Sequence, residues 1–170
     1  MTTPEMIVTT PEVIEELYKT RFSDFVRVAA AITNSVEEGR DAVHDAFVSA
    51  VRENGSYRGD GPVEAWLWRI VVTSALAHRR TQRKSEGLAE PPDAVWTDHY
   101  SGDFGQVRAR IAALPERQRL VLFLRYYADL DYRSIAYTLG IRVGTVGAEL
   151  HAAHLSLRRY LEEVGMGGVE

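Results

Sequence analysis

The chain has 170 residues, of which 20 are basic and 24 acidic, for a formal net charge of −4, and 45% are hydrophobic. This balance is typical of a folded globular protein and excludes disorder over most of the length. The absence of cysteine excludes disulfides, thiolate metal sites and thiol nucleophiles. Because the net charge is negative, any nucleic-acid binding must depend on local basic patches or on a partner.

Two features of the sequence bear on membranes. The apolar runs are far shorter than the ~20 residues that a membrane-spanning helix needs. The first ten residues carry Pro4 and Glu5 where a signal peptide would have basic residues and an apolar core. We therefore expect a cytoplasmic protein with no membrane insertion.

Two helices are predicted at the start of the chain. Apolar residues recur at three- and four-residue steps from Leu17 to Ile32, which predicts the first helix. Ser35 is followed three residues later by Glu38, and this capping-box spacing predicts the start of a second helix. Its apolar face continues to Val51.

A turn-rich stretch and a third helix follow. Asn and Gly residues break the chain between 54 and 61. Pro62 is predicted to be the first residue of the third helix. This helix ends in four cations that suit a helix carboxyl end: Arg79, Arg80, Arg83 and Lys84.

The helical pattern lapses between Ser85 and Asp103. This segment contains two adjacent prolines, two glycines and five acids, and no lysine or arginine. It is predicted to be a flexible acidic linker. It would divide the chain into two helical lobes, residues 1–84 and 104–170.

The second lobe is predicted to be helical throughout. Pro115 is expected to open one helix. Asp131 can cap a short helix that Gly140 would end in left-handed geometry, and a last helix is predicted from about Val143 to Glu163. No segment of the chain has a convincing strand pattern, so the predicted fold class is all-α.

The stretch from Asp131 to Tyr160 has the pattern of a helix-turn-helix. Ala136 provides the small residue where two helices cross closely, and Gly140 provides the turn. Apolar residues that would lock the pair together are Ile135, Leu139, Ile141, Val146 and Leu150. DNA binding is favoured over the alternative of an αα-hairpin in an ordinary helical bundle.

Here the sequence resembles the extracytoplasmic-function (ECF) group of sigma factors, in the sigma-70 family, over nearly the whole chain. The stretch from Asp41 to Val51 resembles the polymerase-binding helix of that group. Residues 57–60 and 65–70 resemble its promoter-melting loop and helix, and residues 114–119 and 144–146 match its carboxyl-terminal lobe. The resemblance implies a subunit that binds core RNA polymerase and reads the −10 and −35 elements of promoter DNA.

The resemblance also implies three sets of functional residues. Residues for the −10 element are Asn54, Ser56, Tyr57, Arg58, Trp68, Arg69, Arg79 and Arg80. Residues for the −35 element are Arg142, Thr145, Gly147, Glu149 and His151. Residues for binding polymerase are Asp41, His44, Asp45, Ser49 and Arg52.

The two tryptophans of the third helix are given different roles. Trp66 is expected to pack in the core. Trp68 lies two positions further on, roughly 200° around a helix, so we expect it to be exposed and available for contact with DNA.

In relatives the acidic linker threads the polymerase channel, where its charge can stand in for nucleic acid; a plain solvated linker is the alternative.

The recognition helix departs from the family pattern at four positions where relatives are basic: Gly147, Glu149, Ala152 and His154. Fewer cations mean fewer phosphate contacts, and these normally dominate affinity. A carboxylate near phosphates is repelled unless it accepts a hydrogen bond from a cytosine amino group. The helix therefore either reads an unusual −35 element or has given up most −35 reading and holds the polymerase flap or an accessory protein.

In the third helix, Val71-Val72-Thr73 replaces the Ala-Arg-Asn of relatives, which places −10 specificity in the loop.

Other classes of protein are less well supported. The histidines lack ligand spacing beside carboxylates, and phosphate loops or nucleophile elbows are missing, so we expect no enzyme, no metal and no cofactor. The open alternative is a stand-alone helix-turn-helix regulator that binds duplex DNA without polymerase. An anti-sigma factor or an accessory activator is a further candidate partner.

Overall fold

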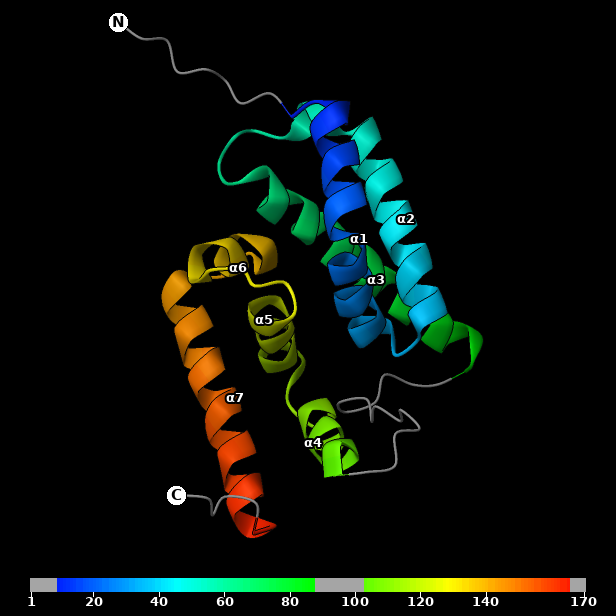
Figure 1. Cartoon of the computed structure of the whole chain (residues 1–170). Coiled ribbons are helices and arrows are strands. Elements are labelled where there is room, and N and C mark those ends of the chain that lie inside the picture. Colours follow the sequence, from blue (N-terminus) through cyan, green and yellow to red (C-terminus); the bar gives the residue numbers. More distant parts are fainter. Residues whose placement is uncertain (1–8, 88–102, 166–170) are drawn as a thin grey trace, which may run out of the picture.

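The computed structural model describes residues 9–87 and 103–165, with side chains from Gln106 onward in the second range. Within these ranges the protein consists of seven α-helices and one short 3₁₀ turn, without a β-strand (Figure 1). The elements are α1 (Pro11–Thr33), α2 (Val36–Arg52), η1 (Asn54–Ser56), α3 (Val63–Ser85), α4 (Asp103–Ala112), α5 (Glu116–Tyr126), α6 (Tyr132–Leu139) and α7 (Val143–Glu163). The all-α prediction is confirmed, and most of the predicted linker lies outside the described residues.

The first lobe is a bundle of α1, α2 and α3 (Figure 1). Its core contains aromatic rings from all three helices, among them Phe25, Phe47 and Trp68, which are at most 7% exposed. The predicted cap of α2 is confirmed, because the Ser35 hydroxyl accepts a hydrogen bond from the Glu38 backbone N–H at 3.2 Å. Helix α3 begins at Val63, one residue later than predicted, with Pro62 at the N-cap position.

The second lobe contains α4 to α7, and α5, α6 and α7 pack against one another. Asp131 caps α6 as predicted, accepting a hydrogen bond from the Ser134 N–H at 2.7 Å. Gly140 ends α6 with φ of 64°, the left-handed geometry expected of a C-cap glycine. Helix α7 covers Val143–Glu163, and α5 begins one residue after Pro115.

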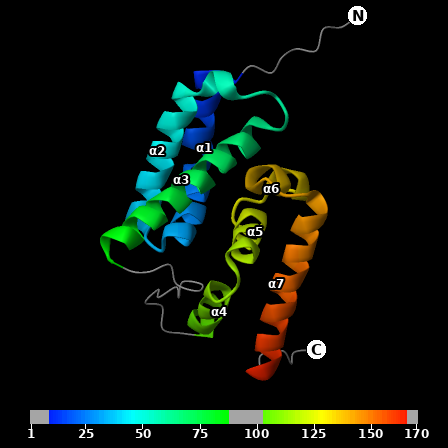
Figure 2. The same cartoon turned by 180° about the vertical axis from the view of Figure 1, so that it is seen from behind.

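The two lobes lie side by side, with α6 lying beside α3 in both views (Figures 1 and 2). The Thr138 hydroxyl donates to the Ala65 carbonyl at 3.3 Å, and both residues are buried. Arg21 of α1 donates to the Ala128 carbonyl at 2.9 Å. The helix-turn-helix therefore packs directly against α3, which carries four of the predicted −10 residues: Trp68, Arg69, Arg79 and Arg80.

The expectation that Trp68 is exposed is wrong, because its side chain is fully buried. Trp68 packs against Phe25 of α1, with ring centroids 4.3 Å apart. Trp66 is buried as expected, but against the loop that precedes α3, where the Tyr57 ring lies 5.6 Å away. The two tryptophans have different neighbours, but neither is exposed, because α1 covers Trp68 and the loop covers Trp66.

Candidate nucleic-acid and polymerase interfaces

The loop before α3 is tied to its own helix by Tyr57. The Tyr57 hydroxyl donates a hydrogen bond to the Gly61 carbonyl, and its ring packs on Trp66. Partial burial raises the pKa of Tyr57, with smaller contributions from Tyr137 and Asp60. The phenol therefore stays protonated and holds the loop in shape, a role that sequence reasoning did not assign to it.

A hollow of about 610 Å³ lies between this loop, α2, α3 and α6. Its walls include three of the residues predicted to bind the −10 element, namely Ser56, Arg58 and Arg69. Asp60 and Trp66 line the same hollow. It thus combines cations, hydrogen-bonding groups and an aromatic wall, which are the groups that hold unstacked bases.

The remaining predicted −10 residues lie elsewhere. Arg80 lines a second hollow of about 450 Å³ that it shares with Arg69. Arg79 faces Glu116 at the start of α5, with their nitrogen and oxygen 3.7 Å apart. Asn54 lies in η1, half-buried. The structure therefore brings together part of the predicted set, and Trp68 does not belong to it.

The predicted polymerase-binding residues lie along the outer side of α2. The side chains of Asp41, His44, Asp45 and Arg52 are exposed, and Ser49 is half-buried. Valine side chains that are about half exposed lie among them, at positions 48 and 51. This mixed polar and apolar strip has the composition of a protein-binding surface.

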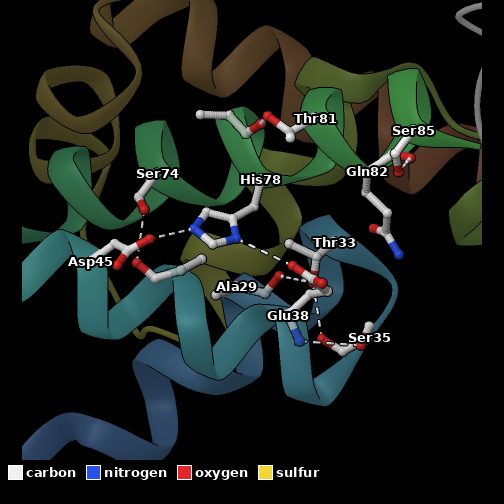
Figure 3. A network of polar contacts seen from close by, with 12 residues as sticks. Ala29, Thr33, Ser35, Glu38, Asp45, Ser74, His78, Thr81, Gln82 and Ser85 are labelled. Atoms are coloured by element: carbon white, nitrogen blue, oxygen red, sulfur yellow. Dashed lines mark hydrogen bonds and ion pairs between the residues drawn. The ribbon is translucent and has the colours of Figure 1, made fainter.

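His78 of α3 lies between two carboxylates of α2, one of which, Asp45, belongs to this surface (Figure 3). Its Nε2 lies 2.7 Å from an Asp45 carboxylate oxygen, and its Nδ1 lies 3.2 Å from a Glu38 carboxylate oxygen. Nearby, the Ser74 hydroxyl donates to the Ala42 carbonyl at 2.8 Å. Glu38 and Asp45 are two helical turns apart on α2, but nothing in the sequence indicated that a histidine 33 residues after Asp45 would bridge them.

This bridge predicts a pH-dependent stability. Burial lowers the pKa of His78, but hydrogen bonds and charge from Asp45 and Glu38 outweigh it, so the pKa lies above its ordinary value of 6.5. The stabilisation is therefore fully present below the unfolded-state pKa and is lost as pH rises through the folded one. We expect His78→Gln to cost about 1 kcal/mol at pH 5.5 and clearly less at pH 8.5, measured by urea unfolding.

The exposed His151 provides the matched control for this measurement, since His151→Gln should change stability little at either pH. If His78→Gln lowers the free energy of unfolding equally at both pH values, the ring acts by packing and not by charge.

The predicted −35 residues occupy the amino-terminal half of α7 and its N-cap, Arg142. Arg142 and His151 are exposed, whereas Thr145 and Gly147 are half-buried. Glu149 is not a free carboxylate, because its oxygen lies 3.8 Å from a guanidinium nitrogen of Arg117 on α5. The repulsion expected between Glu149 and DNA phosphates is thereby reduced by a cation within the lobe.

Within residues 9–87 and 103–165, acidic, histidine or cysteine side chains do not gather in groups of three that could hold a metal ion. In the same ranges, the longest helices are too polar to cross a membrane.

Two helical lobes, one ending in a helix-turn-helix and the other carrying a hollow lined by two arginines and an aromatic ring, define a two-part DNA-binding protein. Residues 17–85 match the family model of Sigma-70 region 2, and residues 104–157 match that of Sigma-70, region 4. The ECF RNA polymerase sigma factor SigM of Mycobacterium tuberculosis H37Rv is 31% identical over 164 residues, which cover 90% of this chain and 79% of SigM. The chain therefore belongs to the sigma-70 family, in its ECF group.

Other relatives agree with this assignment. The RNA polymerase sigma factor YlaC of Bacillus subtilis strain 168 is 27% identical over 86% of this chain and 90% of its own length. The ECF sigma-E factor of Escherichia coli K12 is 29% identical over 75% of this chain and 76% of its own. Sigma factors are non-catalytic subunits of RNA polymerase. As a member of this family, the chain binds core RNA polymerase and directs promoter recognition at the start of transcription.

Two solved structures share the fold. CnrH, in complex with the cytosolic domain of CnrY, superposes with a TM-score of 0.69 at 19% identity and covers 91% of this chain and 90% of its own. RpoE of Bartonella quintana, in complex with the anti-sigma factor NepR, superposes with a TM-score of 0.68 at 20% identity, covering 90% and 98%.

Proposed function

We propose that the first lobe, residues 1–84, binds core polymerase through the exposed side of α2 and melts the −10 element at the hollow beside the loop. The second lobe, residues 104–170, binds the −35 element through the start of α7. The observation that carries this proposal is the hollow itself, where Arg58 and Arg69 lie beside an aromatic wall and an exposed turn. A base that leaves the stack would enter this hollow, and the phosphates that flank it in the strand would lie near the two guanidinium groups.

The proposal extends to a regulatory partner of this chain and to the compartment in which the protein acts. CnrH was solved with the cytosolic domain of CnrY bound and the Bartonella RpoE with the anti-sigma factor NepR bound, and this chain shares their fold. We propose that an anti-sigma factor binds this chain too, and that the protein acts in the cytoplasm, where its polymerase is found. Co-purification of the chain from its native host under non-inducing conditions would test for the anti-sigma factor.

The −10 assignment predicts a selective loss of melting. We expect Arg58→Ala to reduce open-complex formation by at least about tenfold, because Arg58 is exposed on the hollow and its charge is lost from the melted strand. Binding to core polymerase should be unchanged. Permanganate reactivity of unpaired thymines measures the first quantity, and gel filtration with core enzyme the second.

Two controls accompany this test. Arg158→Ala removes another exposed arginine, near the carboxyl end of α7, and should leave melting intact. Tyr57→Phe removes only the hydroxyl that bonds to the Gly61 carbonyl, so it should loosen the loop and weaken melting less than Arg58→Ala does. Normal melting by the Arg58→Ala protein would place the pocket elsewhere.

The −35 assignment predicts a shallow dependence on salt. With few cations at the start of α7, we expect the isolated lobe 104–170 to bind duplex DNA with a log–log salt slope of about −2 to −3. Changing Glu149 and Ala152 to arginine should steepen this slope by about 2. Fluorescence anisotropy titrations from low to physiological salt measure it.

The Arg117–Glu149 pair sharpens this test. Glu149→Gln releases Arg117 toward the phosphates, so the slope should steepen by up to about 1 without a change in sequence preference. Tight binding with a steep slope in the unmodified lobe, together with a lost base preference in Glu149→Gln, would instead show that Glu149 reads a base.

A further inference from the structure

His78 holds the carboxylate of Asp45, one of the predicted polymerase-binding residues, against α3 (Figure 3). The Asp45 side chain is 67% exposed, whereas that of His78 is only 23% exposed. The ring Nε2 and the carboxylate oxygen are 2.7 Å apart, which is the length of a charge-assisted hydrogen bond. An acid on the surface of α2 is thus tied to a half-buried ring of the neighbouring helix.

The contacts of His78 require a ring that is protonated on both nitrogens. Its Nδ1 lies 3.2 Å from a Glu38 carboxylate oxygen, while Nε2 is engaged with Asp45. Ionised carboxylates only accept hydrogen bonds, and a neutral imidazole has a single N–H, so only the imidazolium can donate to both acids. Once one proton is lost, a nitrogen lone pair faces one of the two carboxylates and the bridge opens on that side.

The charges that act on this ring come from α2. The pKa of His78 is raised by its hydrogen bonds to Asp45 and Glu38 and by the charges of these two residues. Asp41, one helical turn from each of them, is exposed and adds negative charge to the same side of α2. The other residues of α1 and α3 that Figure 3 labels are uncharged: Ala29, Thr33, Ser74, Thr81, Gln82 and Ser85.

We propose that His78 competes with core polymerase for Asp45, so that protonation of this histidine weakens the binding of the chain to polymerase. The inference rests on the proposed polymerase-binding role of the exposed side of α2. The imidazolium turns the carboxylate toward α3 and compensates its charge, whereas a neutral ring releases negative charge at this surface. Because only molecules with a released Asp45 can offer it to a polymerase cation, the apparent affinity is reduced by their fraction. His78 is thereby a positioning residue for the polymerase contact.

Competition and structural support predict opposite effects of replacing His78. If the ring only supported α2 against α3, its replacement would weaken both the fold and the binding of polymerase. Under competition, replacement lowers the stability of the lobe while polymerase binding becomes tighter, as long as the pH is low enough for the native ring to be charged. The direction of the change in affinity therefore distinguishes the two roles.

The test is a competition titration of the full chain against dye-labelled unmodified chain for core polymerase of its host. It is performed at about pH 6 and about pH 8.5, on either side of the titration of the histidine. Both competitors meet the same polymerase and carry the same His44, so other titrations cancel in the relative affinity. We expect His78→Gln, which carries no charge, to bind about threefold more tightly than the unmodified chain at the lower pH and equally at the higher pH.

His78→Lys gives the complementary result, because lysine is charged at both pH values. It should match the unmodified chain at the lower pH and bind about threefold more weakly at the higher pH. Circular dichroism at both pH values checks that each variant is folded. Weaker binding of both folded variants at both pH values would overturn the competition, because it would show that the ring only supports the helices.

Glu15→Gln is the matched control for the loss of a surface charge. Glu15 of α1 is 63% exposed and pairs with Lys19, in close analogy to the 67% exposed Asp45 with His78. Its replacement should leave the relative affinity unchanged at both pH values.

Asp45→Asn separates the competition from the proposed polymerase surface. We expect it to bind more weakly than the unmodified chain at the higher pH, and the further change His78→Gln should then bring no gain at the lower pH. If Asp45→Asn binds as tightly as the unmodified chain at the higher pH, the assignment of Asp45 to the polymerase surface is wrong and the competition fails with it. If Asp45→Asn weakens binding but His78→Gln alone gives no gain at the lower pH, the surface stands and the competition is overturned.

Discussion

Replacing Gly39 with alanine is expected to destabilise the first lobe by about 3 kcal/mol. Gly39 is buried where α2 crosses α1, and a Cβ atom there would lie 2.5 Å from the Ala30 nitrogen and 2.7 Å from its Cα. Those atoms belong to a helix backbone and cannot turn aside, so the helices must separate. The midpoint of thermal unfolding should fall by about 10 °C, and polymerase binding should fall with it at physiological temperature.

Gly147→Ala is the matched control, because the same substitution meets a different environment. A Cβ atom at Gly147 would approach only the Tyr132 ring, at 3.8 Å, which is ordinary contact. Alanine should therefore stabilise α7 by about 0.5–1 kcal/mol through its higher helix propensity. Unfolding followed by circular dichroism compares the two variants, and an unchanged midpoint for Gly39→Ala would show that α1 and α2 do not cross so closely.

Replacing Arg119 with methionine is expected to cost the second lobe about 3 kcal/mol. Arg119 is only 3% exposed, and its Nη1 donates to the Ala112 carbonyl at 2.8 Å and to the Leu114 carbonyl at 2.6 Å. These carbonyls lie where α4 ends and the chain turns into α5. Methionine fills a similar volume but leaves buried acceptors without this donor. Lysine should restore part of the loss, since it keeps one cationic donor.

Arg117 provides the comparison for Arg119 two residues away in the same motif. Its side chain is 59% exposed and pairs with Glu149 at 3.8 Å, so Arg117→Met should change stability by no more than about 0.5 kcal/mol. Urea unfolding of the full chain, followed by the far-ultraviolet signal, distinguishes the two. Equal effects would mean that burial of Arg119 contributes nothing to the joint between α4 and α5.

Much of the local structure was predictable because its signals are local. The caps at Ser35 and Asp131 and the left-handed Gly140 depend on hydrogen bonds and backbone angles within a few residues. The helix-turn-helix follows from the spacing of Ala136 and Gly140 between apolar residues. Membership of the sigma-70 family could also be recognised, because its motifs are short and occur in a set order.

The candidate site was predictable only in part, because exposure is decided by distant segments. The sequence predicts that Trp66 and Trp68 lie on different sides of α3, but it does not show that α1 covers Trp68 and the loop covers Trp66. Tyr57 is predicted to bind DNA, and the sequence does not indicate that its hydroxyl also donates a hydrogen bond to the Gly61 carbonyl of its own loop. A pattern within one helix shows which residues share a face, not what packs against that face.

Local signals in the sequence therefore predict the helices, the caps at Ser35 and Asp131, the order of the two lobes and the family. The pairs that join distant elements emerge only from the packing of the helices: His78 with Asp45, Arg79 with Glu116 and Tyr137 with Arg69. The reason is physical. Helix periodicity and capping act over three or four residues, whereas these contacts join side chains 33 or more residues apart, and such pairs form only when whole helices have packed.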